Sequence, residues 1–221
     1  MSVKMGGGGT IAESITKEPQ DMEQNTNSWH AWRAKGIGAS ESPIIMGVSP
    51  WSTPYQLWQE KTGRLKRDFS NYATERGHRL EPKARASYEF KFGYNCPPIL
   101  ATNQRFPFIR ASLDGWNAEN GVILEIKCPG RMDHEKALAG QIPEKYFPQI
   151  QHQFLAVGNA KVAHYYSYDG ERGVCVECLP DLEYQEKLFE ALCAFWQCIR
   201  DDVPPPMTEK ERKKYETKHP K

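Results

Sequence analysis

The sequence has no long apolar run and no excess of charge of either sign. No stretch of its 221 residues reaches the roughly 18 apolar residues that a membrane-spanning helix requires, and no hydrophobic signal region precedes the domain. With 29 basic and 28 acidic residues the net charge is +1, so overall charge does not indicate a nucleic-acid-binding protein. We therefore expect a protein that stays out of the membrane and works in the cytoplasm.

Internal repeats and long linkers are also missing, which favours one domain. Residues 1–27 contain four consecutive glycines and few large apolar side chains, and this composition predicts a flexible tail. Residues 204–221 begin with three prolines and are rich in charge, so we expect this end to fray. The domain is then predicted to span residues 28–203.

Disulfide bonds are not expected, because six cysteines without a secretory signal stay reduced. Cys175 and Cys178 have a spacing typical of metal ligands, but Cys193 and Cys198 do not repeat it. A zinc-dependent interaction domain is an alternative that rests on the first pair alone. Cys128 is expected to be a small core residue without chemistry.

Charge is uneven along the chain although it is balanced overall. Residues 61–91 hold nine Lys or Arg against four Asp or Glu, whereas residues 161–190 hold three against seven. One face of the protein could therefore meet phosphates while another stays away from them. The plain alternative is that these charges are solvated helix faces.

Two carboxylates and an amine stand where two neighbouring strands could bring them together. Residues 108–113 and 122–127 are predicted strands joined by a turn-rich segment, and a hairpin is the simplest arrangement. Alternation along the second strand places Glu125 and Lys127 on one face and apolar residues on the other. Asp114, at the end of the first strand, can reach the same point as Glu125.

This triplet fits metal-assisted phosphodiester chemistry. Two carboxylates suit Mg²⁺ or Mn²⁺ better than zinc, and a metal so held would polarise a phosphoryl oxygen and activate water. Lys127 could deprotonate that water or offset charge on the phosphate. A solvated hairpin carrying the same three residue types is the competing interpretation.

The rest of the chain predicts helices and strands around this hairpin. Residues 74–91 and 181–200 are expected to be helices, the second with an apolar stripe that packs over a sheet. Residues 162–168 and 173–179 are two further predicted strands. Together these elements predict a mixed β-sheet flanked by helices.

Three further segments flank the one that contains Asp114, Glu125 and Lys127. Together these four segments resemble a known family. The flanking segments are residues 36–58 with 61–63, residues 76–85 and residues 142–153. With the Asp114 to Lys127 segment they resemble, in the same order, the phage lambda exonuclease family, also called the YqaJ-like viral recombinases. The resemblance covers about residues 29–157. It departs from the superfamily's PD-(D/E)xK label in one place, because Leu113 stands where the proline is expected.

The resemblance implies a fold, an activity and partners. The fold would be an α/β, restriction-endonuclease-like core with a central mixed sheet flanked by helices. The activity would be a Mg²⁺-dependent 5′→3′ exonuclease, with Mn²⁺ able to substitute, that degrades one strand of linear duplex DNA and leaves a 3′ overhang for recombination. Family members form trimeric rings around DNA and work with a single-strand annealing protein. The gene would belong to a phage or prophage in a bacterial host.

The resemblance also assigns residues near the predicted metal. Asp114, Glu125 and the backbone carbonyl of Ile126 would be metal ligands, and Lys127 the catalytic lysine. Glu81 matches an acidic helix residue close enough to help hold the metal or its water. From the residues alone, Glu81 is more typical of a solvated helix position.

A second group of residues would contact DNA. Arg33 and Ser40 match positions at the terminal 5′ phosphate, for which a guanidinium fork is well suited. Ser112 is a further polar position beside the metal. Gln149 and Gln151 cannot share a helix face, so one of them is expected to be structural, and we favour Gln151 for the contact.

Two rival functions remain open from the sequence. An endonuclease of the same superfamily would use the same triplet on closed DNA. A catalytically silent module could keep the fold and bind DNA ends without cutting them.

Overall fold

The computed structural model describes residues 16–17, 26–66 and 72–218 of the chain. Its elements, in order, are β1 (Thr16–Lys17), α1 (Asn27–Ala34), β2 (Ile37–Gly38), η1 (Ala39–Glu41), α2 (Ser42–Ile45), α3 (Pro54–Lys61), α4 (Tyr72–Phe92), β3 (Ile99–Thr102), β4 (Ile109–Leu113), β5 (Gly115–Asn117), β6 (Val122–Lys127), α5 (Arg131–Leu138), η2 (Glu144–Tyr146), α6 (Phe147–Val157), β7 (Val162–Tyr168), β8 (Gly173–Cys178), α7 (Leu182–Arg200) and α8 (Glu209–Lys218). The predicted mixed α/β fold class is confirmed, as are both strands after α6 and the long helix α7.

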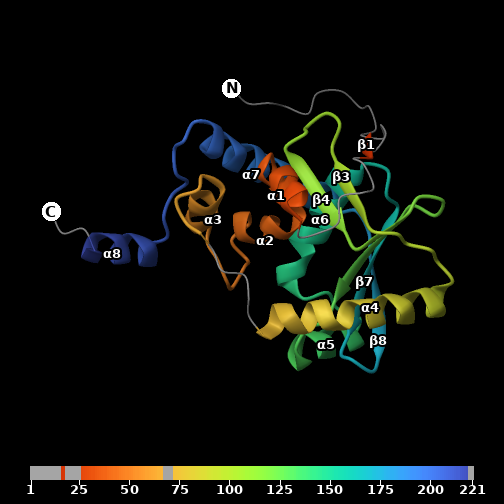
Figure 1. Ribbon diagram of the computed structural model, residues 1–221. Coiled ribbons are helices and arrows are strands. Elements are labelled where there is room, and N and C mark those ends of the chain that lie inside the picture. The colour runs from red at the N-terminus through yellow and green to blue at the C-terminus, as the bar shows by residue number, and fades with distance from the viewer. Residues whose placement is uncertain (1–15, 18–25, 67–71, 219–221) are drawn as a thin grey trace.

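The strands form two mixed sheets of four strands each (Figure 1). The first has the order β1-β3-β4-β2, with β2 parallel to β4 and the other pairs antiparallel. The second has the order β5-β6-β7-β8, with β6 parallel to β7 and its other pairs antiparallel. The parallel pair is possible because α5 and α6 lie between β6 and β7 in the chain and provide the crossover.

The predicted hairpin between residues 108–113 and 122–127 is wrong in its pairing. Strand β4 pairs with β2 and β3, and it is the short β5 that pairs with β6. Asp114 lies at the bend between β4 and β5, where the chain passes from one sheet to the other. Gly115 permits this bend, because a Cβ there would lie 2.7 Å from both Cβ and the carbonyl oxygen of Cys96.

The second sheet is covered on both faces, which explains the apolar character of β6. One face, with Leu124 and Ile126, packs under α4 around the buried Tyr88. The other face, with Ile123, joins the main core, to which α6, α7 and β4 also contribute. In Figure 1, α4 crosses the strands β7 and β8, while α6 and α7 lie on the other side of the molecule. Glu125 therefore points into the main core and not into solvent.

Helix boundaries follow ordinary capping chemistry. Thr26 and Thr53 cap α1 and α3 by accepting hydrogen bonds from main-chain N–H groups, and Asp181 caps α7 in the same way. Pro148 lies in the first turn of α6, and Gly158 ends that helix with a φ of 79°. Helix α6 is thus fixed at both ends beside β6.

Both ends of the chain contain structure that the sequence did not predict. Within the segment expected to be a tail, Thr16 and Lys17 pair with β3, while residues 1–15 and 18–25 lie outside the described residues. The end expected to fray forms α8, begun by reciprocal hydrogen bonds between Thr208 and Glu211. The Glu211 carboxylate also accepts a hydrogen bond from Thr53 Oγ1, which attaches α8 to the start of α3.

The cysteine spacing does not make a zinc site. Cys175 and Cys178 are three residues apart on the strand β8, so their side chains point to opposite faces. Cys178 lies in the main core and Cys175 packs against the core under α4. Burial raises the pKa of Cys178 to about 11 and of Cys175 to about 12, so both stay protonated thiols near neutral pH. The zinc alternative is therefore rejected.

No helix among the described residues is both long and apolar enough to cross a membrane.

Acid should destabilise this fold through His152. The side chain is fully buried on α6, its Nδ1 lies 2.7 Å from Ser42 Oγ, and burial lowers its pKa from 6.5 to about 4. Between those two values the unfolded chain binds a proton that the folded protein does not. The free energy of unfolding should therefore fall as the pH drops from 6.5 to 4, by about 3 kcal/mol from this group.

Urea unfolding followed by tryptophan fluorescence at several pH values measures this slope. His152→Gln should flatten it, and the same change at the exposed His78 should leave it as in the wild type. Equal slopes in wild type and His152→Gln would contradict the assignment.

Candidate active site

The predicted triplet converges where the two sheets meet. Asp114 stands at the bend after β4, while Glu125 and Lys127 lie on the same face of β6. The Asp114 Oδ2 accepts a hydrogen bond from the main-chain N–H of Ile126 at 2.7 Å. Lys127 Nζ lies 2.5 Å from Glu125 Oε1. The structure therefore brings the three predicted residues together at one place.

Glu125 is a buried carboxylate surrounded by donors. Only 1% of the residue is exposed, and Gln149 Nε2 donates to its Oε1 at 2.7 Å. Gln153 Nε2 donates to Oε2, and Lys127 shares Oε1. A carboxylate offers about four lone-pair directions, so these three donors leave about one for a further ligand. Three donors satisfy a charge that would otherwise be costly to bury.

Asp114 has far less compensation for its charge. Burial, then the nearby Glu125 carboxylate and then Glu81 raise its pKa well above the usual range, although Lys127 and the Ile126 N–H oppose this. Two close carboxylates that resist joint ionisation are a natural site for a divalent cation, because its charge offsets their repulsion.

The donor set fits Mg²⁺ or Mn²⁺. Asp114 and Glu125 supply carboxylate oxygens, and the buried Ser112 Oγ, two residues before Asp114, has no hydrogen-bond partner among the described residues. No group of three or more His, Cys, Asp or Glu side chains in the described part of the chain could hold a metal by itself. The remaining ligands would have to be main-chain oxygen, water or substrate, which is usual for Mg²⁺. The carbonyl of Ile126 as a ligand stays a prediction.

Lys127 is held as a cation. Burial alone would lower its pKa, but the Glu125 and Asp114 carboxylates outweigh that effect and raise it. Its Nζ also lies 5.5 Å from the centre of the Tyr146 ring, a cation–π distance. Without a bound metal, the ammonium form is therefore the stable one.

Glu81 lies on α4 at the edge of this site. Its Oε1 accepts from Arg85 Nη2 at 3.4 Å, and its side chain is 36% exposed. Its charge acts on Asp114, since it contributes to the raised pKa of that residue. It makes no direct contact with the triplet that would fix it as a ligand, so its role stays a prediction.

Arg33 and Ser40 come together as a second polar site. Arg33 Nη2 donates to Ser40 Oγ at 3.2 Å and to Glu41 Oε1 at 3.2 Å. This site is joined to the triplet through the backbone, because β2 pairs with β4 in parallel and β4 leads directly into Asp114. Arg33 and Ser40, the two residues predicted to contact the 5′ phosphate, thus lie together. They stand on either side of the short strand β2, which pairs with β4.

The choice of Gln151 over Gln149 is wrong in its geometry. Gln151 is fully buried and bonds the Leu179 carbonyl, the Asp181 N–H and the Gln185 side chain, on the face of α6 turned away from Glu125. Gln149 is the residue that contacts Glu125. The two glutamines lie on different faces of α6, as expected, and Gln149 has the supporting role predicted for it, but Gln151 does not face the site.

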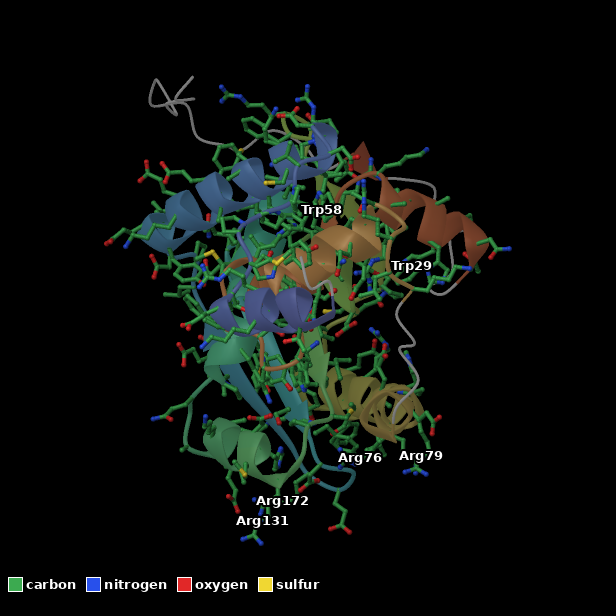
Figure 2. All side chains as sticks on the ribbon, turned by 90° about the vertical axis from the view of Figure 1, so that its left-hand side faces the viewer. Trp29, Trp58, Arg76, Arg79, Arg131 and Arg172 are labelled. Atoms are coloured by element: carbon green, nitrogen blue, oxygen red, sulfur yellow. The ribbon has the colours of Figure 1, made fainter. Side chains whose placement is uncertain are left out.

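Two residues of the site were missed by sequence reasoning. Gln153 follows Gln149 by four residues, so both lie on the same helix face, and this spacing was the available signal. Arg76 on α4 donates to the carbonyls of Cys128 and Pro129 and to that of Asp169, and so ties α4 to the ends of β6 and β7. Figure 2 shows Arg76 and Arg79 near the end of the molecule where Arg131 and Arg172 also lie.

A strand bend that carries an aspartate beside a Glu-x-Lys strand, within a mixed α/β fold, defines the class of PD-(D/E)xK proteins. The chain belongs to the YqaJ-like viral recombinase domain family, whose model matches residues 28–161. It is 28% identical over 190 residues to the uncharacterised protein YqaJ of Bacillus subtilis (strain 168), an alignment that covers 84% of this chain and 59% of that protein. The chain therefore spans about three-fifths of the length of this relative. The family resemblance seen in the sequence is confirmed.

Solved structures share the fold. The crystal structure of LHK-Exo in complex with dAMP matches with a TM-score of 0.71 at 23% identity, covering 87% of this chain and 99% of that one. LHK-Exo, an alkaline exonuclease from Laribacter hongkongensis, also matches in a second structure with a TM-score of 0.70 at 22% identity, with the same coverage. A phage-related exonuclease from Haemophilus somnus 129PT matches with a TM-score of 0.56 at 16% identity over 76% of this chain and 95% of that one.

Asp114→Asn should stabilise the protein when no divalent cation is bound. The change keeps the shape and the acceptor for the Ile126 N–H but removes a charge that repels Glu125, so the free energy of unfolding at neutral to mildly alkaline pH should rise by about 1 kcal/mol. Millimolar Mg²⁺ should raise the melting temperature of the wild type and not of the variant. Thermal unfolding in chelator and in Mg²⁺ measures both effects.

Asp133→Asn is the matched control, because Asp133 has a favourable partner in Lys145 at 2.7 Å. It should not stabilise the protein, and it should keep the response to Mg²⁺. A cation response that is equal in wild type and Asp114→Asn would remove Asp114 from the metal site.

Proposed function

We propose that this protein is a Mg²⁺-dependent 5′→3′ exonuclease that degrades one strand of linear duplex DNA and leaves a 3′ overhang for homologous recombination. The observation that carries this proposal is the pair of carboxylates, half-buried Asp114 and buried Glu125, with Lys127 beside them at the bend between the sheets. Membership of the YqaJ-like viral recombinase family supports a DNA exonuclease as the general activity. The structural neighbours are described as exonucleases, one of them in complex with dAMP, and they point in the same direction.

Asp114, Glu125 and the Ile126 carbonyl would hold Mg²⁺, which when bound supplies a Lewis acid for a phosphoryl oxygen and makes water more acidic. The residues of the chain provide the orientation. Gln149 and Gln153 fix the Glu125 carboxylate from two directions, so its position does not depend on the cation alone. This is the arrangement expected when a ligand must be aimed before substrate arrives.

The surroundings of Lys127 favour a role as a positive charge and not as a general base. The neighbouring carboxylates raise its pKa, so Lys127 is protonated before a cation binds. A charged ammonium 2.5 Å from a ligand carboxylate can offset negative charge that develops on the phosphate. The attacking water would then give its proton to a group other than Lys127.

Arg33 and Ser40 would bind the terminal 5′ phosphate. The distance between their polar atoms is 3.2 Å, and Arg33 has five N–H donors in all, so donors remain for an incoming anion. A separate anchor for the end of the strand favours an exonuclease over an endonuclease, because an endonuclease does not need to recognise a terminus. The intact triplet argues against a catalytically silent end-binding module.

A trimeric ring and a single-strand annealing partner complete the proposal. A closed ring with threefold symmetry would keep the enzyme on DNA between cuts, and the exposed 3′ strand would be delivered to the annealing protein. Light scattering should give a mass three times that of the 25.3 kDa chain. A monomer at working concentration would remove the ring from the proposal.

The central test is digestion of linear duplex DNA labelled at either end, with and without a 5′ phosphate, in Mg²⁺ and in chelator. We expect loss of the 5′-terminal label first, a preference for phosphorylated ends and no product in chelator. A closed circular duplex of the same sequence should survive. Cutting of the circle would favour the endonuclease, and end binding without cutting would favour the silent module.

Three variants connect the test to the site. Asp114→Ala should lower the rate by about a thousandfold or more, because a ligand carboxylate is lost. Lys127→Arg keeps a positive charge and should retain more activity than Lys127→Met if the lysine acts as a charge. Full activity in Asp114→Ala would contradict the assignment of the active site, and equal losses in the two Lys127 variants would contradict the charge role.

A further inference from the structure

The guanidinium of Arg33 is held by a carboxylate that no part of the proposed function uses. Arg33 Nη2 donates to Glu41 Oε1 at 3.2 Å as well as to Ser40 Oγ. The Arg33 carbon Cζ lies 4.8 Å from the centre of the Trp29 ring, so the flat guanidinium also contacts an aromatic face. Figure 2 shows Trp29 at the α1 side of the molecule, far from the Arg131 and Arg172 end.

Glu41 is anchored independently of Arg33. Its Oε2 accepts from the main-chain N–H of Gly38 at 2.8 Å and lies 2.8 Å from Lys61 Nζ. Only 12% of the Glu41 side chain is exposed. Burial would raise the pKa of Glu41, but Lys61 and Arg33 outweigh burial and lower it, so the group stays ionised. One oxygen of the carboxylate is thus fixed by the backbone and Lys61, and the other is left to Arg33.

Lys61 offsets the charge of the Glu41 carboxylate, so that an anion can bind close to Arg33. Its side chain is 8% exposed, and besides Glu41 it donates to the carbonyl oxygens of Gly36 at 2.7 Å and Arg33 at 3.3 Å. Without Lys61, Glu41 would cancel the charge of Arg33 and repel a phosphate. With Lys61, the three side chains carry a net charge of +1 and the accessible cation is Arg33.

The backbone leaves the guanidinium little room to turn. A Cβ at Gly38 would lie 3.2 Å from Arg33 Nη2, so the absence of a side chain there lets the guanidinium lie against the strand β2. The Trp29 ring, Gly38 and Glu41 therefore restrain Arg33 from three directions, and 27% of its side chain remains exposed.

We propose that Glu41 is a positioning residue which, neutralised by Lys61, aims the Arg33 guanidinium at the terminal 5′ phosphate and so sets the preference for phosphorylated DNA ends. This inference rests on the proposed function, in which Arg33 binds that phosphate. It adds that the preference depends on a buried ion pair behind the arginine. Restricting a flexible arginine in advance lowers the entropy lost on binding, which is how such a pair raises affinity.

Binding measured apart from cleavage tests the inference. Fluorescence anisotropy in chelator compares two duplex oligonucleotides that differ only in a 5′ phosphate or a 5′ hydroxyl. The wild type should bind the phosphorylated duplex about tenfold more tightly, and Glu41→Gln should reduce that ratio to about twofold or less. A purely structural role for Glu41 would weaken binding of both duplexes in parallel and leave the ratio unchanged, which would overturn the inference.

Two further variants protect the test from misfolding and from general charge effects. Glu41→Gln leaves Lys61 buried without its partner, so the double variant with Lys61→Met removes both charges and should fold even where the single variant does not. Its ratio should also fall to about twofold or less, because Arg33 again loses its restraint. Glu183→Gln breaks an exposed ion pair with Lys187 on α7 and should keep the wild-type ratio.

The outcome separates this inference from the proposed function. A wild type that degrades linear DNA but binds both duplexes equally overturns the inference and leaves the exonuclease standing. A wild type that prefers the phosphorylated end but never cuts DNA overturns the exonuclease activity and leaves the inference standing. Loss of the preference in Glu183→Gln as well would also overturn the inference, since the effect would then follow general charge.

Discussion

The hydrogen bond from the Ile126 N–H to the Asp114 carboxylate is the contact on which the arrangement of this protein depends. It links the bend that follows β4 to the strand β6, and so it joins the two sheets at the place where the candidate site lies. Gly115 allows the chain to turn there against Cys96, and β5 then pairs with β6. Because Glu125 and Lys127 alternate with Leu124 and Ile126 along β6, the same contact that closes the sheets also brings the three functional side chains to one point.

The site contrasts two ways of burying a carboxylate. Glu125 has three donors, two of them amides from successive turns of α6, and it is nearly inaccessible. Asp114 has one main-chain donor and two carboxylates near it, and its pKa is raised as a result. The first group is held in place by its three donors, while the second is the group whose ionisation a cation would favour. Binding of a divalent cation is therefore expected to depend on Asp114 for its energetic response and on Glu125 for its geometry.

Local patterns in the sequence predicted the parts of the site that depend on local geometry. Alternation along residues 122–127 placed Glu125 and Lys127 together, and helical spacing placed Leu188, Leu192 and Phe195 in the core. The pairing of β4 was not predictable in this way, because a hairpin and a crossing between two sheets have the same local pattern. The wrong orientation predicted for Gln151 has a similar cause, since α6, buried along nearly its whole length, shows no polar face by which to orient it. Glu41 and Lys61 are 20 residues apart, and their pairing depends on how the fold places the end of α3 beside Gly36 and Glu41.

A carboxylate fixed by several donors occurs twice in the structure, once in the candidate active site and once beside Arg33. At Glu125, a buried carboxylate that is the proposed metal ligand is held by two amides; at Glu41, a mostly buried carboxylate is held by Lys61 and the Gly38 N–H and in turn holds Arg33. Both acids are buried where an isolated charge would be costly, and both are tolerated because their partners are fixed by other elements of the fold. The parallel pairing of β2 with β4 connects the two sites through a few residues of backbone. A phosphate anchored at Arg33 would thus be held at a fixed offset from Asp114, and that offset is what an enzyme needs in order to cut at a constant distance from a strand end.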